Sequence, residues 1–252
     1  MYWPSVRPPG SLTTPEIREL WRLRLSLLAL KPEVDPEQDF ESFARFIRAC
    51  HVGRVYDEEG RVVATMSYAR LDGQFEGQRW CLANYEYAFI EPHMRSHPAI
   101  VAMYIMLFYG CLSWRPGVRN FLCFVGYPKT VLTYARRVPE LKLDADPSLD
   151  ALELHLIERY IERLVQERFD PDRRVVWMPT IPPRMSSEWL ARNAEDPLLA
   201  SYLERSPRWQ EGEALIAISR LDDGLRLVRE LGVRVLARAK RASSERKLEP
   251  LR

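Results

Sequence analysis

Apolar side chains recur every three or four residues in two stretches near the N-terminus, which predicts two amphipathic helices. The first covers residues 14–30, with Thr14 as the expected cap and Pro15 in its first turn. Its inner stripe is predicted to consist of Leu20, Leu23, Leu27 and Leu30. The second covers residues 35–50, where the same spacing relates Phe40, Phe43, Phe46 and Ile47. The segment KPEVDP between them interrupts the helical pattern.

From residue 51 the apolar pattern changes to the alternation that is typical of β-strands. Residues 51–73 contain two such runs, separated by a predicted hairpin turn at 57–60. A longer strand is predicted at 79–90, and its alternation is expected to place three aromatic rings on one face: Tyr85, Tyr87 and Phe89. The elements expected next are an apolar helix, a strand and a short helix, at 98–114, 121–127 and 128–137.

The remaining sequence is more helical. An amphipathic helix is predicted from Ser148 to just before Asp170, and a final helix from about 222 to 240. The shorter elements are a strand, a helix and a strand, at 174–178, near Trp189 and at 214–219. We therefore expect one α+β domain with a mixed, mostly antiparallel central sheet flanked by helices. Residues 1–145 would form its core, and 146–252 a helical elaboration whose late strands complete the sheet.

The charge balance excludes one class of partner. The chain has 252 residues, enough for one large domain, and its 37 Lys and Arg nearly balance 35 Asp and Glu. With a net charge of +2, binding to nucleic acid or another bulk polyanion is not expected. The basic residues are nevertheless concentrated from Arg234 onward, where Glu245 and Glu249 are the acidic exceptions.

The cysteines and the apolar stretches predict a cytoplasmic protein without a metal site. Four cysteines lie far apart with no CxxC pair, and most are in apolar runs, so we expect them to be reduced and buried. The N-terminus lacks the basic region and apolar core of a signal peptide. The stretch 99–114 is short for a transmembrane span and rich in Tyr and Gly, and is expected to be a buried helix.

The motifs of several large enzyme classes are absent. The sequence contains no GxSxG, Walker loop, HExxH or GxGxxG. This argues against a serine hydrolase of the lipase type, a P-loop NTPase, a zinc protease and a Rossmann-type dehydrogenase.

The order of the predicted elements resembles that of the GNAT N-acyltransferase superfamily over about residues 15–138. The resemblance implies two initial helices, a three-strand meander, and a strand–loop–helix unit that holds the pyrophosphate of the acyl donor. It further implies that two neighbouring strands part after residue 90 and leave a V-shaped opening for the pantetheine arm. The implied activity is the transfer of an acyl group from a thioester to a small-molecule amine.

The implied donor-binding loop departs from the family pattern. That pattern is Arg or Gln, two residues, Gly, one residue, then Gly or Ala, and here it falls on Arg95, Ser96, His97, Pro98, Ala99 and Ile100. Arg95 matches, whereas Pro98 and Ile100 replace the two small residues. Proline lacks one of the N–H donors that would bind a phosphate, although it suits the start of a helix. The interpretation of this loop as the donor-binding residues rests on the resemblance.

Two residues are candidates for catalysis. Glu86 lies among tyrosines in an apolar strand, where a carboxylate has its proton affinity raised and is able to accept a proton from the attacking amine. The alternative is an outward-facing residue with a surface partner. Tyr134, in the short helix after the strand 121–127, corresponds to a family tyrosine that protonates the leaving thiolate. Tyr127 competes for that role, and His93 and His97 are further candidates to contact phosphate or transfer a proton.

The changed loop makes two donors possible, acyl-CoA or the thioester of an acyl carrier protein. Autoinducer synthases and N-acyl amino acid synthases are GNAT-like enzymes of the second kind and depend less on a glycine-rich loop. The basic helix at 226–241 is a candidate docking site for an acidic carrier protein. The competing hypothesis is a GNAT-like protein that has lost catalysis and acts as a binding or scaffold module, favoured by Pro98 and Ile100.

Overall fold

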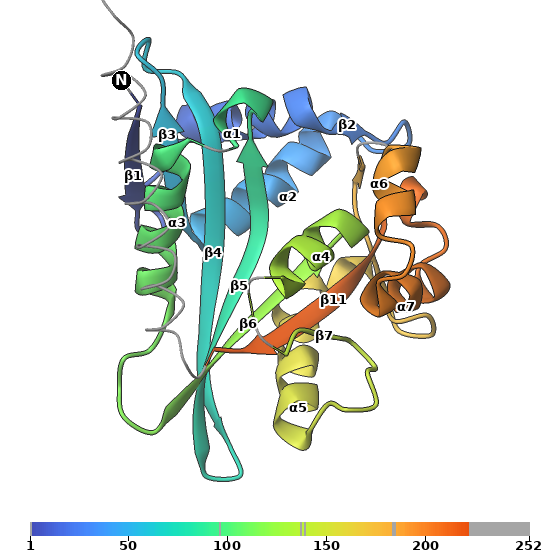
Figure 1. Ribbon diagram of the computed structural model, residues 1–252. Coiled ribbons are helices and arrows are strands. Elements are labelled where there is room, and N and C mark those ends of the chain that lie inside the picture. Colours follow the sequence, from blue (N-terminus) through green and yellow to red (C-terminus); the bar gives the residue numbers. More distant parts are fainter. Residues whose placement is uncertain (1, 96, 137, 139, 183–184, 222–252) are drawn as a thin grey trace, which may run out of the picture.

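A central sheet of nine strands runs through the part of the protein that the structure describes (Figure 1). The computed structural model describes residues 2–221 except 96, 137, 139, 183 and 184, and only the backbone of residue 86. The strands lie in the order β1-β3-β4-β5-β6-β11-β9-β8, with β7 beside β11. Their bounds are Trp3–Arg7 (β1), His51–Tyr56 (β3), Val62–Phe75 (β4), Gln78–Ile90 (β5), Val118–Gly126 (β6), Lys142–Leu143 (β7), Phe169–Asp170 (β8), Val175–Trp177 (β9) and Glu213–Arg220 (β11). A separate two-stranded sheet joins β2 (Ala29–Leu30) and β10 (Thr180–Ile181).

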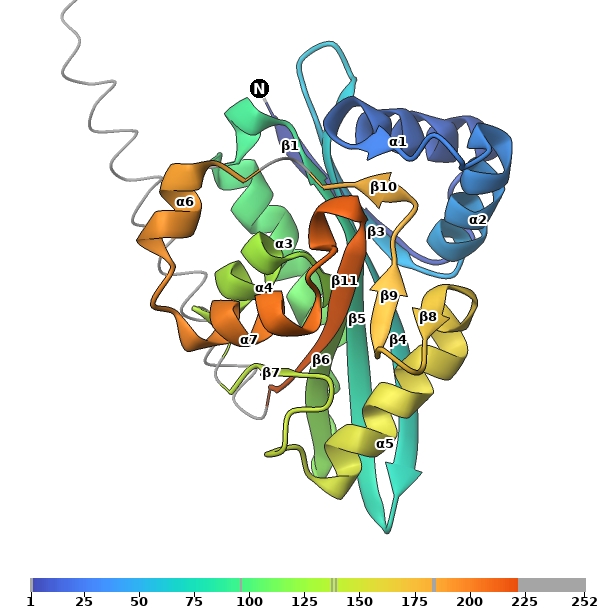
Figure 2. The same ribbon diagram turned by 90° about the vertical axis from the view of Figure 1, so that its right-hand side faces the viewer.

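Helices cover both faces of the central sheet (Figure 2). Their bounds are Thr14–Leu27 (α1), Pro36–Arg48 (α2), Pro98–Cys111 (α3), Pro128–Ala135 (α4), Ala151–Tyr160 (α5), Ser187–Arg192 (α6) and Pro197–Arg205 (α7). Buried residues of α3, α4 and α7 share one cluster on one face of the sheet. On the opposite face, α1 and α2 pack over β3 to β5, and α5 packs over β6 and β11. The predicted α+β architecture, a mostly antiparallel sheet flanked by helices, is therefore confirmed.

The cap of helix α1 lies one residue earlier than predicted, at Thr13. The Glu16 N–H donates to the hydroxyl of Thr13, and the Glu16 carboxylate accepts from the Thr13 N–H, which makes a capping box. Thr14 instead occupies the first helical position. Helix α5 has the same arrangement, in which Asp150 and its own third residue, a glutamate, form a capping box in place of the predicted start at Ser148.

The inner side of α1 contains a charged residue that the predicted leucine stripe does not include. Leu20 and Leu23 are buried as predicted, but Leu30 lies in β2 and Arg24 takes a buried place. The Arg24 guanidinium donates two hydrogen bonds to the carboxylate of Asp39 on α2, at 2.8 and 3.0 Å. Nε1–H of Trp21 donates a third bond to the same carboxylate, at 2.7 Å. This buried ion pair fastens α1 to α2.

Helix α3 is a surface helix rather than the fully buried one that its composition predicts. One side, including Met103 and Leu107, is buried against β1, β3 and β4. On the other side Met106 and Tyr109 remain 45% and 59% exposed. None of the described helices combines the length and the apolar character of a membrane span.

The C-terminal third differs more from the prediction. The helix predicted from Ser148 ends its α-helical part at Tyr160, because the backbone then widens into a π-helical turn at Ile161–Val165. The predicted late strand is present as β11 and pairs with β6. Strand β1 and helix α7 were not predicted. The predicted helix 222–240 and the basic segment around it lie outside the described residues.

Candidate active site

Strands β5 and β6 form the one parallel pair among the described strands of the central sheet, and they part halfway along β5 (Figure 1). Their pairing runs from Arg79 opposite Val118 to Asn84 opposite Cys123, and then stops. Beyond that point, among the strands that the structure describes, β5 pairs only with β4, and β6 only with β11. We call this point of separation the fork. It lies after Asn84, so the prediction that the strands part after residue 90 is wrong in position.

A β-bulge in β5 lies at the fork. Tyr68 of β4 is opposite Tyr85, whereas Met66 is opposite Ala88, so that β5 has one residue more than β4 in this interval. The extra residue falls at Glu86 and Tyr87, opposite Ser67.

The bulge changes which face of the sheet the aromatic residues cover. Tyr85 belongs to the cluster under α3, whereas Tyr87 and Phe89 belong to the cluster under α1 and α2. The prediction that all three lie on one face is therefore wrong, because one extra residue reverses the alternation of a strand.

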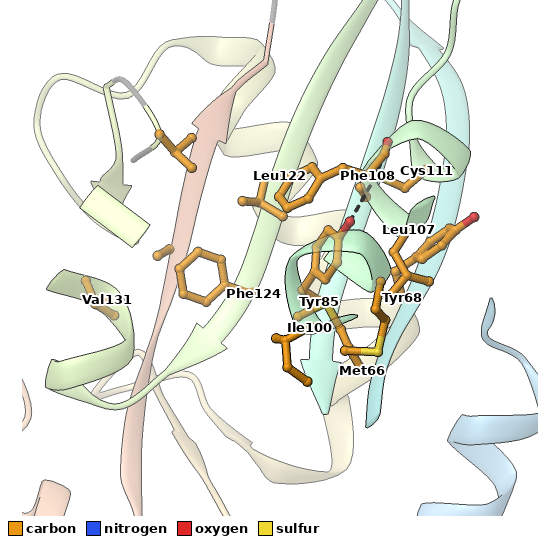
Figure 3. Close-up of a cluster of buried hydrophobic side chains, with 14 of the residues drawn as sticks. Met66, Tyr68, Tyr85, Ile100, Leu107, Phe108, Cys111, Leu122, Phe124 and Val131 are labelled. Atoms are coloured by element: carbon orange, nitrogen blue, oxygen red, sulfur yellow. Dashed lines mark hydrogen bonds between the residues drawn. The ribbon is translucent and has the colours of Figure 1, made fainter. Parts of the chain in front are cut away.

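On the α3 face, aromatic side chains of β5, α3 and β6 pack around the fork (Figure 3), and one of α4 adjoins them. Tyr85 stacks on Phe108 of α3 with ring centroids 4.9 Å apart, and its hydroxyl lies 3.4 Å from Sγ of Cys111. Phe124 of β6 packs against Tyr134 of α4, at 4.6 Å. Burial raises the pKa of Tyr85 well above its usual value, and the neighbouring Cys111 and Tyr134 add to this rise. Tyr134 therefore lies beside the fork, half-buried at its α4 side.

On the opposite face the fork has polar side chains in an apolar wall. Asn84 and Ser67 are both fully buried. Neither the amide nitrogen nor the amide oxygen of Asn84, nor the hydroxyl of Ser67, has a hydrogen-bond partner among the described residues. Tyr87, beyond them, packs edge-on against Phe43 and Phe46, each at 5.0 Å. From the sequence, Asn84 and Ser67 could line the cleft, but no motif singles out either residue.

The loop that leads from β5 to α3 uses its backbone donors within the chain. The N–H groups of Arg95 and His97 donate to carbonyl oxygens of the 3₁₀ turn Pro92–Met94. The Ala99 N–H donates to Nδ1 of His97 (3.2 Å), and the Ile100 N–H donates to the His97 carbonyl. His97 thus caps α3 itself.

The side chains of the predicted donor-binding residues differ in exposure. Arg95 is exposed and His97 is half-buried against the Tyr2 ring, at 4.6 Å. Ala99 and Ile100 are buried in the cluster under α3. Ser96 lies outside the described residues.

The remaining candidates are placed as follows. The backbone of Glu86 forms part of the bulge, and its side chain lies outside the described part of the structure. Tyr127 donates its hydroxyl hydrogen to the Thr180 carbonyl at 2.8 Å, which ties β6 to β10. His93 lies 3.4 Å from the carboxylate of Glu91, on the surface of the loop.

Further features of the described residues bear on chemistry. The four cysteines are buried and none is in a disulfide: Cys50, Cys81, Cys111 and Cys123. Within the described part of the chain no group of His, Cys, Asp and Glu is arranged to hold a metal ion. A surface depression on α2, between Phe40 and Ala49, is lined by residues of that helix and of its C-terminal end, and not by the fork.

No protein-family model matches the sequence, and a comparison with curated proteins gives no match. Among solved structures, the chain is similar to a predicted acetyltransferase from Clostridium acetobutylicum with acetyl-CoA (14% identity, TM-score 0.42), over 62% of this chain and 99% of that one. It is also similar to the loading GNATL domain of CurA from Lyngbya majuscula (12%, TM-score 0.39), over 86% and 97%. A third is a conserved protein of unknown function from Enterococcus faecalis (13%, TM-score 0.40), over 53% of this chain and only 31% of that one. Because these TM-scores are below 0.5, the similarities carry no argument about function, which is instead argued from the pairing of the chain's own strands.

Proposed function

We propose that this chain is an N-acyltransferase that transfers an acyl group from a thioester to an amine. The observation that supports it is the fork between the parallel strands β5 and β6 after Asn84 and Cys123. Beyond the fork, residues 85–90 have no partner strand on their β6 side among the described elements. An unpaired strand edge offers peptide groups to an extended ligand. The amide-containing pantetheine arm of an acyl donor is a ligand of this kind.

The proposed chemistry is direct attack of the amine on the thioester. Glu86, at the bulge, accepts a proton from the amine nitrogen as it attacks, directly or through a water molecule. Tyr134, beside the fork on α4, gives a proton to the thiolate as the C–S bond breaks. Glu86 belongs to β5, and Tyr134 belongs to α4, which follows β6, so the two residues come from the two sides of the fork.

The donor phosphate is proposed to bind at the start of α3, at Arg95, Ser96, His97, Ala99 and Ile100. The exposed Arg95 guanidinium is the most direct contact. The N–H groups of His97, Ala99 and Ile100 already have acceptors in the chain, so they would bind phosphate only by exchanging those partners. This favours a donor held mainly elsewhere. An acyl carrier protein docked at the basic segment 226–241 is such a donor, and acyl-CoA is the alternative.

A second candidate function is a binding or scaffold module without catalysis. Two observations favour it: the satisfied N–H groups of the loop, and the dense packing of Tyr85, Phe108 and Phe124 around the fork. In this case the side chains that a donor arm must displace would stay in place.

The two functions are separated by titrating the purified protein with acetyl-CoA, a long-chain acyl-CoA and an acylated carrier protein. An acyltransferase should bind at least one, and mass spectrometry should detect acylation of some member of a panel of amino acids and polyamines. A scaffold module should bind none. Arg95→Ala should weaken binding of a CoA donor, whereas the exposed Arg22→Ala on α1 should not. If none of the three donors binds, the acyltransferase proposal fails.

A further inference from the structure

The polar pair Asn84 and Ser67 lies where the two strands begin to part. Asn84 is the last residue of β5 that pairs with β6, and Ser67 of β4 is opposite the bulge. Both side chains are 0% exposed, and their polar atoms have no partner among the described residues. In the sheet Asn84 stands between Ala69 and Cys123.

The two side chains share one face of the sheet. Ser67 is opposite Val52, and Asn84 is opposite Ala69, and both of these partners belong to the cluster under α1 and α2. Ser67 and Ala69 are two residues apart on β4, so Ser67 and Asn84 are diagonal neighbours on adjacent strands. The polar pair therefore forms a single patch on the side opposite to α3.

We infer that Asn84 is a catalytic residue whose Nδ2–H donates to the thioester carbonyl oxygen as negative charge develops there. This inference rests on the proposed acyl transfer. An amide N–H in a buried, water-free place stabilises an oxyanion strongly, because no solvent competes and the donor is already in position. Oδ1 of the same amide accepts an N–H of the attacking amine. The hydroxyl of Ser67 supplies a second polar contact to this end of the substrate.

The amine nitrogen forms a bond to the thioester carbon, and the carbonyl π pair moves to the oxygen, which Asn84 holds as an oxyanion. The base takes one proton from the nitrogen. The oxyanion pair then returns to form the amide carbonyl, the C–S bond breaks, and the thiolate leaves with its bonding pair and is protonated. Asn84 is unchanged throughout.

An unpaired buried amide destabilises a fold, so a function at this position has a measurable signature. Asn193 is the matched control, since it is also buried but has partners for both ends of its amide. It accepts from Arg136 at 2.5 Å and donates to the Trp189 carbonyl at 2.6 Å. Leucine has nearly the shape of asparagine without its polar atoms. Asn84→Leu therefore removes an amide that has no hydrogen-bond partner among the described residues, whereas Asn193→Leu removes one that is hydrogen-bonded at both ends.

The test measures thermal unfolding of the full chain and, with the donor and amine found to react, kcat and KM. Asn84→Leu should unfold at a higher temperature than the unsubstituted protein, while Asn193→Leu should unfold at a lower one. The kcat of Asn84→Leu should fall roughly 10²- to 10³-fold, the usual effect of losing one oxyanion donor, with the KM of the donor nearly unchanged. Ser67→Ala should show a smaller loss in the same direction.

Three results would overturn the inference. If Asn84→Leu keeps its kcat, the amide takes no part in the reaction. If its unfolding temperature falls with its activity, the amide is structural. If the unsubstituted chain binds a donor and transfers no acyl group, the proposed function itself fails, and Asn84 then has no oxyanion to stabilise. The inference is supported if the unsubstituted chain is active and Asn84→Leu is more stable than that chain but has lost kcat.

Discussion

The buried ion pair between α1 and α2 has an exposed counterpart on the same two helices. Arg24 and Asp39 have side chains only 2% and 3% exposed, whereas Arg18 and Glu37 are 32% and 68% exposed. Both pairs have two guanidinium–carboxylate hydrogen bonds of 2.8–3.0 Å. Removing the carboxylate of Asp39 or that of Glu37 therefore compares the contribution of the same contact to stability when it is buried and when it is exposed to water.

Asp39→Ala removes three hydrogen bonds and leaves the Arg24 guanidinium buried without an opposite charge. Breaking a buried pair from one side costs about 3–5 kcal/mol of the free energy of unfolding. For a chain of this size, each kcal/mol lowers the melting temperature by about 2–4 °C, so we expect a fall of roughly 6–20 °C. Glu37→Ala leaves Arg18 in water and should cause only a marginal change.

Both variants are compared by urea unfolding and by thermal melting at one protein concentration. A third variant, Arg24→Met with Asp39→Leu, removes both charges and should be more stable than Asp39→Ala. Its remaining deficit would come from Nε1–H of Trp21, which loses its acceptor, at about 1–3 kcal/mol. Equal losses in Asp39→Ala and Glu37→Ala would refute the reasoning, because burial would then make no difference.

Three further outcomes concern titration, thiol reactivity and turnover. The hydrogen bond from the Thr13 N–H, aided by Arg54, lowers the pKa of Glu16 from 4.5 to about 2. Because the folded pKa of Glu16 lies below the unfolded one, ionised Glu16 stabilises the fold fully above pH 4.5, and this stabilisation is lost as the pH falls toward 2. Glu16→Gln should therefore flatten this part of the plot of melting temperature against pH. Parallel plots for the variant and the unsubstituted protein would contradict this. Burial raises the pKa of Cys81 and Cys111 to about 12. Neither thiol should therefore react with Ellman's reagent at mildly alkaline pH until the protein unfolds. Prompt labelling of these two cysteines in the native protein would contradict this prediction. Glu86→Gln should reduce turnover without lowering the melting temperature, and unchanged turnover would remove it from the mechanism.

The sequence predicted the elements whose pattern is local. The hairpin of β3 and β4 and the start of α3 at Pro98 appear where periodicity and turn residues placed them. Short elements that depend on a distant partner were missed: β1 has five residues and exists through its pairing with β3. Helix α7 was not predicted although it has a local signal, the cap Asp196 before a proline.

The candidate site was less predictable because it depends on strand register. Alternation along β5 alone places Tyr85 and Tyr87 on the same side, and only pairing with β4 reveals the extra residue between them. The role of Asn84 is equally invisible in the sequence, since an asparagine in a strand has a partner or lacks one only after the sheet has formed. The loop residue His97 shows the same limit: its ring caps α3, which its neighbours in sequence do not indicate.

The place of β11 in the sheet makes the last third of the chain indispensable to the first. Within the described part of the chain, residues 124–126 of β6 pair in the sheet only with β11, which follows almost ninety residues later in the sequence. A fragment cut after α4 would expose Phe124 and Val125 on an open strand edge, a template for self-association. Shortened versions of this protein should therefore precipitate instead of forming an independent N-terminal module.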